Sequence, residues 1–288
     1  MKIALFNDFR LGLVQDDRIY DIGAVLFGDD HSHPCLMSAF IHRYGEYKDI
    51  VMERMNEAPV YMLAETRLRQ PVARPGKILA APVNYASHQR EMNVRHTARG
   101  LGFFLKASSS LIGPGDAIVL PASKPGRRFD HELELAAVIG QRAKNVKAVD
   151  ADKYIFGYTC LNDVTLRPDE HHEEERCLRK SFDTFTPVGP WIVTADEIGD
   201  PQNLQMTLHV NDERRQHANT GSMICGIAEL VEIFSHVTTL EPGDIIATGT
   251  PDGVAPIRPG DVVRIEIECI GVLANPVETE LQRGREAQ

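Results

Sequence analysis

Cysteine is scarce in this sequence and is not arranged for cross-linking. The five cysteines, out of 288 residues, are scattered and odd in number, and no two of them form a Cys-x-x-Cys pair. Small secreted domains held by disulfides have a much denser and more regular cysteine pattern. We therefore expect reduced thiols and a cytoplasmic protein.

Long apolar runs and a basic excess are also missing. No stretch reaches the roughly 20 apolar residues that cross a bilayer, and the segment 1–12 (MKIALFNDFRLG) lacks the apolar region of a secretory signal. The formal net charge is −10, from 31 basic and 41 acidic residues. These features disfavour a nucleic acid or a membrane as partner. They leave room for a local cationic pocket that binds an anionic metabolite.

The sequence does have a globular composition, with 43% hydrophobic and 25% charged residues. Residues 1–27 are patterned as short strands, and residues 35–70 as helix. The stretch 69–76 (RQPVARPG) has the composition of a linker. We therefore predict a small N-terminal α/β domain over residues 1–72 and a larger domain over residues 73–288.

Two carboxylates interrupt an apolar run at residues 130–140 (DHELELAAVIG). Side chains of a strand alternate between its faces, so Glu132 and Glu134 point the same way and His131 points the other way. Two like charges side by side repel each other and lose hydration on burial. A hard divalent cation would hold such a pair. An edge strand with both carboxylates in water is the alternative.

Asp163 follows a second strand-like run, at residues 154–159, and offers a third oxygen ligand. Three carboxylates would leave the other coordination positions of a cation to water and substrate. The pair Asn162-Asp163 is also compatible with a simple turn. Lys106 likewise follows a strand, where it either reaches an anionic ligand or is solvated.

His88 and Glu91 are three residues apart, so they are neighbours on one face if their segment is helical. A carboxylate that accepts the proton of one imidazole nitrogen leaves the other nitrogen free to act as a base toward water. A surface ion pair has the same spacing and is the alternative.

Two further segments carry groups suited to an anionic substrate. Lys180 precedes a compact cluster of Ser, Asp and Thr, where its charge would stabilise an enolate or a carboxylate. Thr250 lies among small residues at 248–251 (TGTP), where a ligand carboxylate can approach the backbone closely. A structural turn is the alternative there.

Six segments, in this order, resemble the fumarylacetoacetate hydrolase superfamily. They are YASHQREM (85–92), SSSLIGPGDAIVLP (108–121), HELELAAVIG (131–140), GYTCLNDVTLR (157–167), KSFDTFTPVGPWIVT (180–194) and LEPGDIIATGTPDGV (240–254). The resemblance covers roughly residues 75–277, and the combination outweighs each local alternative. It implies an α+β protein with a small N-terminal domain, a catalytic domain of mixed β-roll type, and a homodimeric state.

The resemblance also implies roles for individual residues. Glu132, Glu134 and Asp163 are implied to bind Mg²⁺, or Mn²⁺ or Ca²⁺ as in some members. His88 and Glu91 resemble the dyad that activates a water molecule.

The substrate-binding and remaining catalytic residues follow from the same resemblance. Lys180 resembles the active-site lysine, and Thr250 resembles the residue that holds a substrate carboxylate. We expect Lys106 and Arg167 to bind the substrate as well.

The members of this superfamily act mostly on 2-oxo and 2,4-dioxo acids. The resemblance implies an Mg²⁺-dependent enzyme that hydrolyses a C–C bond in an acylpyruvate- or fumarylpyruvate-like acid, with the departing fragment held as an enolate on the metal. Lyase or isomerase action on a related 2-oxo acid is the alternative: oxaloacetate decarboxylation, 2-hydroxymuconate-type isomerisation, or processing of a 3-deoxy-2-oxo sugar acid. A non-catalytic metal-binding protein is a third class.

One position departs from the hydrolytic pattern. Many hydrolytic members carry Arg-Asp-x-Gln after the third metal ligand, whereas this chain has Arg167-Pro168-Asp169-Glu170. An ionised carboxylate at Glu170 cannot donate a hydrogen bond as an amide does, which weakens the expectation of hydrolysis. The motifs do not constrain residues 93–101 and 167–179, to which we assign recognition of the distal group of the substrate.

Overall fold

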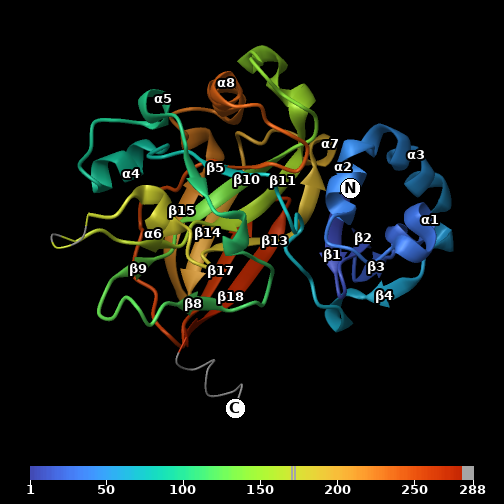
Figure 1. Ribbon diagram of the computed structural model, residues 1–288, viewed down its shortest axis with the longest axis horizontal. Coiled ribbons are helices and arrows are strands. Elements are labelled where there is room, and N and C mark those ends of the chain that lie inside the picture. The colour runs from blue at the N-terminus through green and yellow to red at the C-terminus, as the bar shows by residue number, and fades with distance from the viewer. Residues whose placement is uncertain (170, 172, 281–288) are drawn as a thin grey trace.

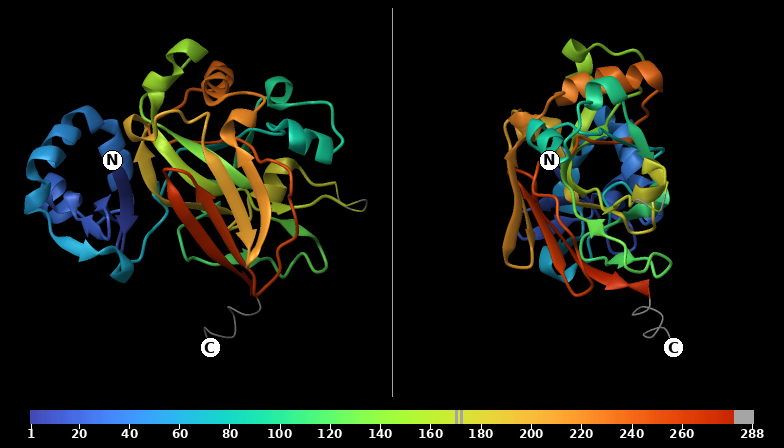
Figure 2. Two further views of the ribbon diagram at one scale, coloured as in Figure 1. Left: turned by 180° about the vertical axis from the view of Figure 1, so that it is seen from behind. Right: turned by 90° about the vertical axis from the view of Figure 1, so that its left-hand side faces the viewer.

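The computed structural model describes residues 1–169, 171 and 173–280. An N-terminal region of strands and helices lies at one side of a larger, rolled β-structure that is flanked by short helices (Figure 1). The predicted α+β class with mixed β-structure is therefore confirmed. The left view in Figure 2 shows from behind that the N-terminal region lies at one side of the β-structure.

The N-terminal region contains β1 (Lys2–Phe6), β2 (Arg10–Gln15), β3 (Arg18–Tyr20), α1 (Ile22–Phe27), α2 (Leu36–His42), α3 (Tyr44–Arg54) and β4 (Val60–Met62). The helices that follow are α4 (Ala86–Glu91), α5 (Ala98–Leu101), α6 (Arg176–Lys180), α7 (Ala195–Ile198) and α8 (Ile227–Val237). The strands that follow are β5 (Ile78–Ala80), β6 (Phe104–Lys106), β7 (Leu111–Ile112), β8 (Ile118–Leu120), β9 (Phe129–Asp130), β10 (Leu133–Ile139), β11 (Ile155–Asn162), β12 (Thr165–Leu166), β13 (Thr186–Thr194), β14 (Gln205–Val210), β15 (Glu213–Asn219), β16 (Ile245–Ala247), β17 (Val262–Ile267) and β18 (Gly271–Thr279).

Two sheets make up most of the β-structure. The larger has the order β4-β3-β2-β1-β13-β11-β10-β16-β5-β6, with β7 also paired to β13, and the smaller has the order β15-β14-β17-β18-β8. Both sheets are mixed, since β16 runs antiparallel to β10 but parallel to β5, and β18 runs antiparallel to β17 but parallel to β8. The pairing of β1 with β13 joins the N-terminal strands to the larger sheet.

Strand β10 is buried on both faces because each face packs against a different core. Leu135 and the other odd-numbered residues contribute to a core shared with β14 and β17. Ala136 and Val138 contribute to a second core, built with residues of α2 and α3. Glu132 and Glu134 continue this even-numbered face beyond the second core, and they are only 4% and 2% exposed. An edge strand with solvated carboxylates is therefore excluded.

The predicted helix over residues 35–70 is wrong beyond Arg54. Helices α2 and α3 cover its first part, and a short 3₁₀ turn follows at Met55–Glu57. Pro59 cannot donate a backbone hydrogen bond and restricts the residue before it, so the helical path ends there. The chain then forms β4, which pairs with β3 in the register Tyr20↔Val60.

Residues 69–76 contain no helix or strand and lead into β5. Residues from both sides of this stretch share one hydrophobic core, in which Leu5 and Phe40 are found with Ile78 and Phe156. The N-terminal region is thus packed against the rest of the chain. A domain boundary between residues 72 and 73 stays a prediction.

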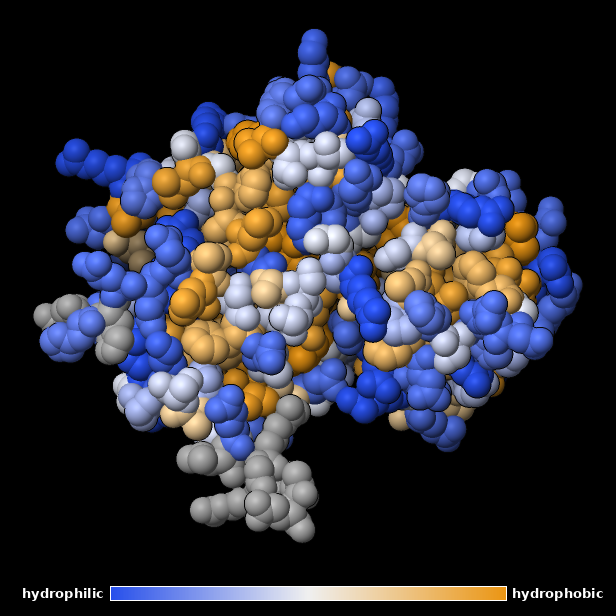
Figure 3. Space-filling model, viewed as in Figure 1, coloured by the Kyte–Doolittle hydropathy of each residue, from blue (hydrophilic) through white to orange (hydrophobic). Residues whose placement is uncertain are grey.

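The longest helices of the described chain, α3 and α8, have 11 residues each, and none of the described helices has the length and hydropathy of a bilayer span. Hydrophilic residues dominate the periphery in Figure 3, while hydrophobic residues group on the face of the β-structure. Large apolar side chains around α4, α5, β6 and α6 are 43% to 48% exposed, namely those of Met92, Leu101, Leu105 and Leu178.

Of the three Pro-Gly-Asp turns in the sequence, those at residues 242–244 and 259–261 differ in the burial of their aspartate. Asp244 is fully buried, accepts hydrogen bonds from the backbone N–H groups of Lys77 (3.0 Å) and Glu241 (2.7 Å), and pairs with the Lys77 ammonium. Asp261 accepts from the backbone N–H of Arg258 (2.8 Å) near the surface. Asp244 therefore ties the start of β5 to the turn before β16.

We predict that Asp244→Ala lowers the free energy of unfolding by roughly 3 kcal/mol, because it leaves buried donors and an ammonium group unpaired. Asp261→Ala, the matched control, should cost about 1 kcal/mol. Urea unfolding of both variants and the unmodified protein measures the difference. Equal losses for the two variants would contradict a special role for the buried turn.

Candidate active site

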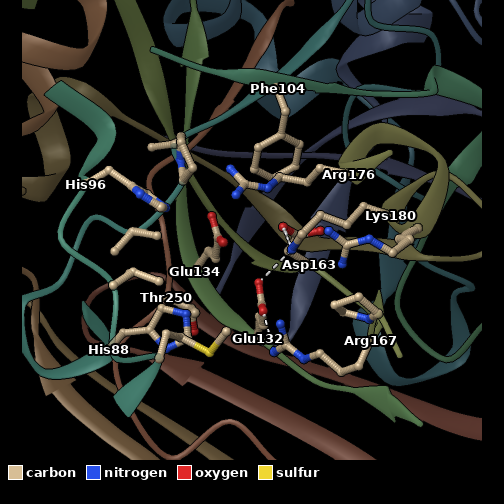
Figure 4. A pocket seen from close by; sticks show the side chains of 17 residues that line it. His88, His96, Phe104, Glu132, Glu134, Asp163, Arg167, Arg176, Lys180 and Thr250 are labelled. Carbon is tan, nitrogen blue, oxygen red and sulfur yellow. Dashed lines mark hydrogen bonds and ion pairs between the residues drawn. The ribbon is translucent and has the colours of Figure 1, made fainter. Parts of the chain in front are cut away.

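A pocket of about 220 Å³ lies where β10 begins and collects residues from widely separated parts of the chain. Seven of the nine predicted site residues line it: His88, Glu132, Glu134, Asp163, Arg167, Lys180 and Thr250. Figure 4 shows the three carboxylates between His88 and Thr250 on one side and Lys180 and Arg176 on the other.

The antiparallel pairing of β10 with β11 brings the three carboxylates together. The register Leu133↔Asn162 sets Glu132 opposite Asp163, whose backbone N–H donates to the Glu132 carbonyl (2.9 Å). One oxygen from each of Glu132, Glu134 and Asp163 lies within 4.8 Å of the other two, and all three residues are buried. Without compensation, three charges this close would repel one another strongly.

Cationic side chains compensate two of the three carboxylates. The Lys180 ammonium donates to Glu132 Oε2 (2.8 Å) and Asp163 Oδ2 (2.5 Å). Arg167 Nη2 donates to Glu132 Oε1 (2.6 Å), and Lys106 Nζ donates to Asp163 Oδ1 (2.5 Å). Burial alone would raise the pKa of Glu132, but Lys180 and Arg167 outweigh it and hold that pKa below its ordinary value.

Glu134 has no cationic side chain bound to it among the described residues. Its Oε2 accepts a hydrogen bond from the backbone N–H of Gly249 (2.8 Å). Burial, and then the charges of Asp163 and Glu132, raise its pKa well above the ordinary value. A buried carboxylate that lacks a cation, beside two others, is a donor set that fits Mg²⁺, Mn²⁺ or Ca²⁺.

The His88–Glu91 pair lies at the pocket wall. His88 Nδ1 is 2.8 Å from Glu91 Oε2, and the His88 side chain is only 7% exposed. Glu91 Oε1 accepts a hydrogen bond from the backbone N–H of Gly253 (2.9 Å), which attaches α4 to the loop after β16. With Glu91 as acceptor, Nδ1 carries the ring proton and Nε2 is free to accept one.

Gln216 of β15 fixes the orientation of the Thr250 hydroxyl group. Its Oε1 accepts from the Leu133 N–H (2.9 Å) and lies 3.1 Å from His131 Nδ1, while its Nε2 donates to Thr250 Oγ1 (2.9 Å). The Leu133 N–H is an obligatory donor, so the amide has one orientation. Because Thr250 Oγ1 accepts from Gln216, its own proton is available to a ligand in the pocket.

Comparison with known proteins identifies the family. The model of the fumarylacetoacetate (FAA) hydrolase C-terminal region matches residues 77–278. This chain belongs to the fumarylacetoacetate hydrolase family. The family resemblance found in the sequence is therefore confirmed.

The similar proteins include both hydrolases and isomerases. A maleylpyruvate hydrolase from Aquipseudomonas alcaligenes is 43% identical over 95% of this chain and 98% of its own length. The maleylpyruvate hydrolase of Sphingobium sp. SYK-6, solved with manganese(II) and pyruvate, is 42% identical with a TM-score of 0.86, over 97% of this chain and 99% of that one. A 2-hydroxyhepta-2,4-diene-1,7-dioate isomerase from Mycobacterium marinum is 33% identical with a TM-score of 0.75, over 97% and 99%.

Lys106 and Arg167, which we expected to bind the substrate, are bound to protein groups instead. Lys106 is buried behind Asp163, donates to the carbonyls of Lys180 (2.6 Å) and Phe185 (3.2 Å), and is not among the residues that line the pocket. Arg167 does line the pocket, but its guanidinium is bound to Asp130 and Glu132. Their placement favours a role in holding the carboxylates rather than in contacting the substrate.

Some pocket residues carry no motif and were not singled out in the sequence. His96, Phe104, Arg176 and Arg179 line the pocket, and three of them belong to the segments assigned above to distal recognition. The sequence signal for Arg176 and Arg179 is only a dense run of charge, which is also typical of a solvated helix. Glu170 lies outside the described residues, so its effect on the reaction stays a prediction.

We predict that Glu134→Gln removes most of the stabilisation that a divalent cation gives. Saturation with Mn²⁺ at one hundred times its Kd should raise the free energy of unfolding of the unmodified protein by about 2.7 kcal/mol. In chelator, Glu134→Gln should be at least as stable as the unmodified protein, because it removes a buried and repelled charge. Thermal unfolding with Mn²⁺ and with chelator measures both effects.

The matched control is Glu53→Gln, at an exposed carboxylate of α3. It should retain the full Mn²⁺-induced increase in stability. An undiminished increase in Glu134→Gln would contradict the assignment of this carboxylate as a ligand.

Proposed function

We propose that this protein hydrolyses a C–C bond in a 2,4-dioxo acid of the acylpyruvate class, such as maleylpyruvate or fumarylpyruvate. The observation that carries the proposal is the buried His88 imidazole, which is paired with Glu91 and lines the same pocket as three clustered carboxylates. The 43% identity to a maleylpyruvate hydrolase over nearly the whole chain supports it.

Glu132, Glu134 and Asp163 would hold the divalent cation, for which we propose Mg²⁺ or Mn²⁺, with Ca²⁺ as a further candidate. The cation would act as a Lewis acid that stabilises negative charge on the oxygens of a 2-oxo acid. Lys106, Lys180 and Arg167 keep the carboxylates in place by the contacts described above.

His88 is positioned to act as the general base. Its Nε2 takes a proton from water, and the hydroxyl oxygen attacks the distal carbonyl carbon of the dioxo acid. The Glu91 carboxylate stabilises the imidazolium that forms, while the Gly253 N–H keeps Glu91 oriented. The C–C bond beside that carbonyl then breaks, and its electron pair stays on the pyruvate fragment as an enolate.

The proton that His88 takes from water is used again in the reaction, and Thr250 and Lys180 assist at the substrate. The imidazolium of His88 gives its proton to the terminal carbon of the enolate, which becomes the methyl group of pyruvate. One dioxo acid and one water thus give pyruvate and a second carboxylic acid. The Thr250 hydroxyl, oriented by Gln216, donates a hydrogen bond to the carboxylate of the 2-oxo acid. The Lys180 ammonium adds positive charge near the developing enolate.

Isomerase or lyase action on a related 2-oxo acid is the second candidate. The run Arg167-Pro168-Asp169-Glu170, which lacks the amide of hydrolytic members, favours it, and so does the 33% identity to an isomerase. On the resemblance alone we also propose a homodimer, and from the scattered, odd-numbered cysteines we propose a cytoplasmic location.

We predict that the Mn²⁺-loaded protein converts maleylpyruvate to pyruvate and maleate in equal amounts, followed by proton NMR. His88→Ala should lower kcat on the order of 10³-fold, because general-base catalysis commonly contributes 10²- to 10⁴-fold. Chelation of the metal should abolish turnover.

His236→Ala, at an exposed histidine of α8, is the matched control and should retain full activity. Undiminished hydrolysis by His88→Ala would contradict the proposed base. Isomerised substrate with no pyruvate would replace the hydrolase proposal with the isomerase one.

A further inference from the structure

Helix α6 presents two guanidinium groups to the pocket without a carboxylate partner among the described residues. Arg176 and Arg179 are three positions apart, so they project from the same side of the helix. The Arg176 guanidinium lies 5.5 Å from the ring centroid of Phe104. Arg179 is held by main-chain carbonyls instead, with Nε donating to Glu174 (3.2 Å) and Nη1 donating to Leu166 (3.3 Å).

The acidic groups near α6 are already bound to other cations. Glu174 pairs with Lys124 (2.6 Å) and Arg127 (2.9 Å), and Arg127 also pairs with Asp169 (2.8 Å). The positive charges of Arg176 and Arg179 are therefore not neutralised by these neighbours.

The positive charges of Arg176 and Arg179 repel each other in the pocket unless an anion is bound there. Burial lowers the pKa of Arg179, and the nearby charges of Arg176 and Arg167 lower it further. Four cationic side chains and three carboxylates line the pocket, so a divalent cation would bring its net charge to three positive. A substrate with two carboxylates neutralises this charge better than a substrate with one.

The two arginines line the same pocket as the carboxylate cluster. The Lys180 ammonium, which contacts Glu132 and Asp163, and the Arg176 guanidinium both lie within 5.5 Å of the centre of the Phe104 ring. Figure 4 shows Arg176 and Phe104 across the carboxylates from Thr250 and His88. A ligand that places its 2-oxo acid end at the carboxylates and Thr250 therefore directs its other end toward α6.

We propose that Arg176 and Arg179 bind the distal carboxylate of the substrate, so that the protein selects dioxo acids with two carboxylates over those with one. Guanidinium groups suit this role because they bind a carboxylate through two parallel hydrogen bonds. Maleylpyruvate has the required distal carboxylate, whereas acetylpyruvate ends in a methyl group. This inference rests on the proposed function for its substrate class.

The test compares kcat/KM for maleylpyruvate and acetylpyruvate in the Mn²⁺-loaded protein. Arg176→Gln and Arg179→Gln should each lower kcat/KM for maleylpyruvate about 10- to 100-fold, mainly through KM, since a charged hydrogen bond is lost. Each should change kcat/KM for acetylpyruvate by less than about 3-fold. Arg176→Lys keeps the charge but not the paired geometry and should recover only part of the loss.

Arg90→Gln is the matched control, because it removes an exposed positive charge of α4 that lies between two pocket-lining residues, His88 and Met92, and does not itself line the pocket. It should leave both substrates unaffected. An equal loss for both substrates in the α6 variants would overturn the proposal, because it indicates a structural or general catalytic role. An equal loss of kcat/KM for maleylpyruvate in Arg90→Gln would overturn the proposal too, because it indicates only long-range electrostatic attraction.

A binding measurement separates failure of this inference from failure of the proposed function. Calorimetry with the Mn²⁺-loaded protein compares 2-oxoadipate with 2-oxohexanoate, which have six carbons each and differ in the distal carboxylate. At least about 10-fold tighter binding of 2-oxoadipate, lost in the α6 variants, supports the subsite even where no dioxo acid is hydrolysed. Equal affinity for the two acids would overturn it.

Discussion

The buried cluster of Glu132, Glu134 and Asp163 is the constraint on which the rest of the site depends. Three carboxylate oxygens within 4.8 Å of one another, shielded from water, repel unless positive charge is supplied. The chain supplies part of it through Lys106, Lys180 and Arg167. That leaves Glu134 without a cationic side chain among the described residues. The arrangement suits a divalent cation, because the lysine and arginine side chains hold Glu132 and Asp163 in position while Glu134 stays available to bind the cation.

The fold explains how such a cluster is tolerated. Strand β10 packs on one face against the smaller sheet and on the other against the N-terminal helices, so its backbone is fixed along its length. Glu132 and Glu134 lie next to the second core, on the same face as Ala136 and Val138. The pairing of β10 with β11 brings Asp163 beside them. Segments from distant parts of the sequence then complete the pocket: α4 with His88, the proposed general base, α6 with three cationic residues, and the loop after β16 with Thr250. The strands hold the carboxylates, and the shorter segments line the rest of the pocket.

The local features of the site could be predicted from sequence, whereas features that depend on tertiary partners could not. The period of two placed Glu132 and Glu134 on one face, and the i,i+3 spacing indicated the His88–Glu91 contact. Gln216 lies in a strand with no motif, and its role depends on Leu133 and Thr250 being brought to it. Lys106 was expected at the substrate because a strand end does not reveal which way a lysine extends. The strand β4 was missed because its pairing with β3, rather than its composition, determines its conformation.

The most direct test of the central claim is anomalous diffraction from crystals grown with Mn²⁺. The account predicts one strong anomalous peak at about 2.2 Å from carboxylate oxygens of Glu132, Glu134 and Asp163, as expected for a small divalent cation. The Lys180 ammonium would remain in contact with Asp163 or Glu132 beside it. The absence of a peak there at saturating Mn²⁺, or a peak only at other carboxylates, would contradict the account.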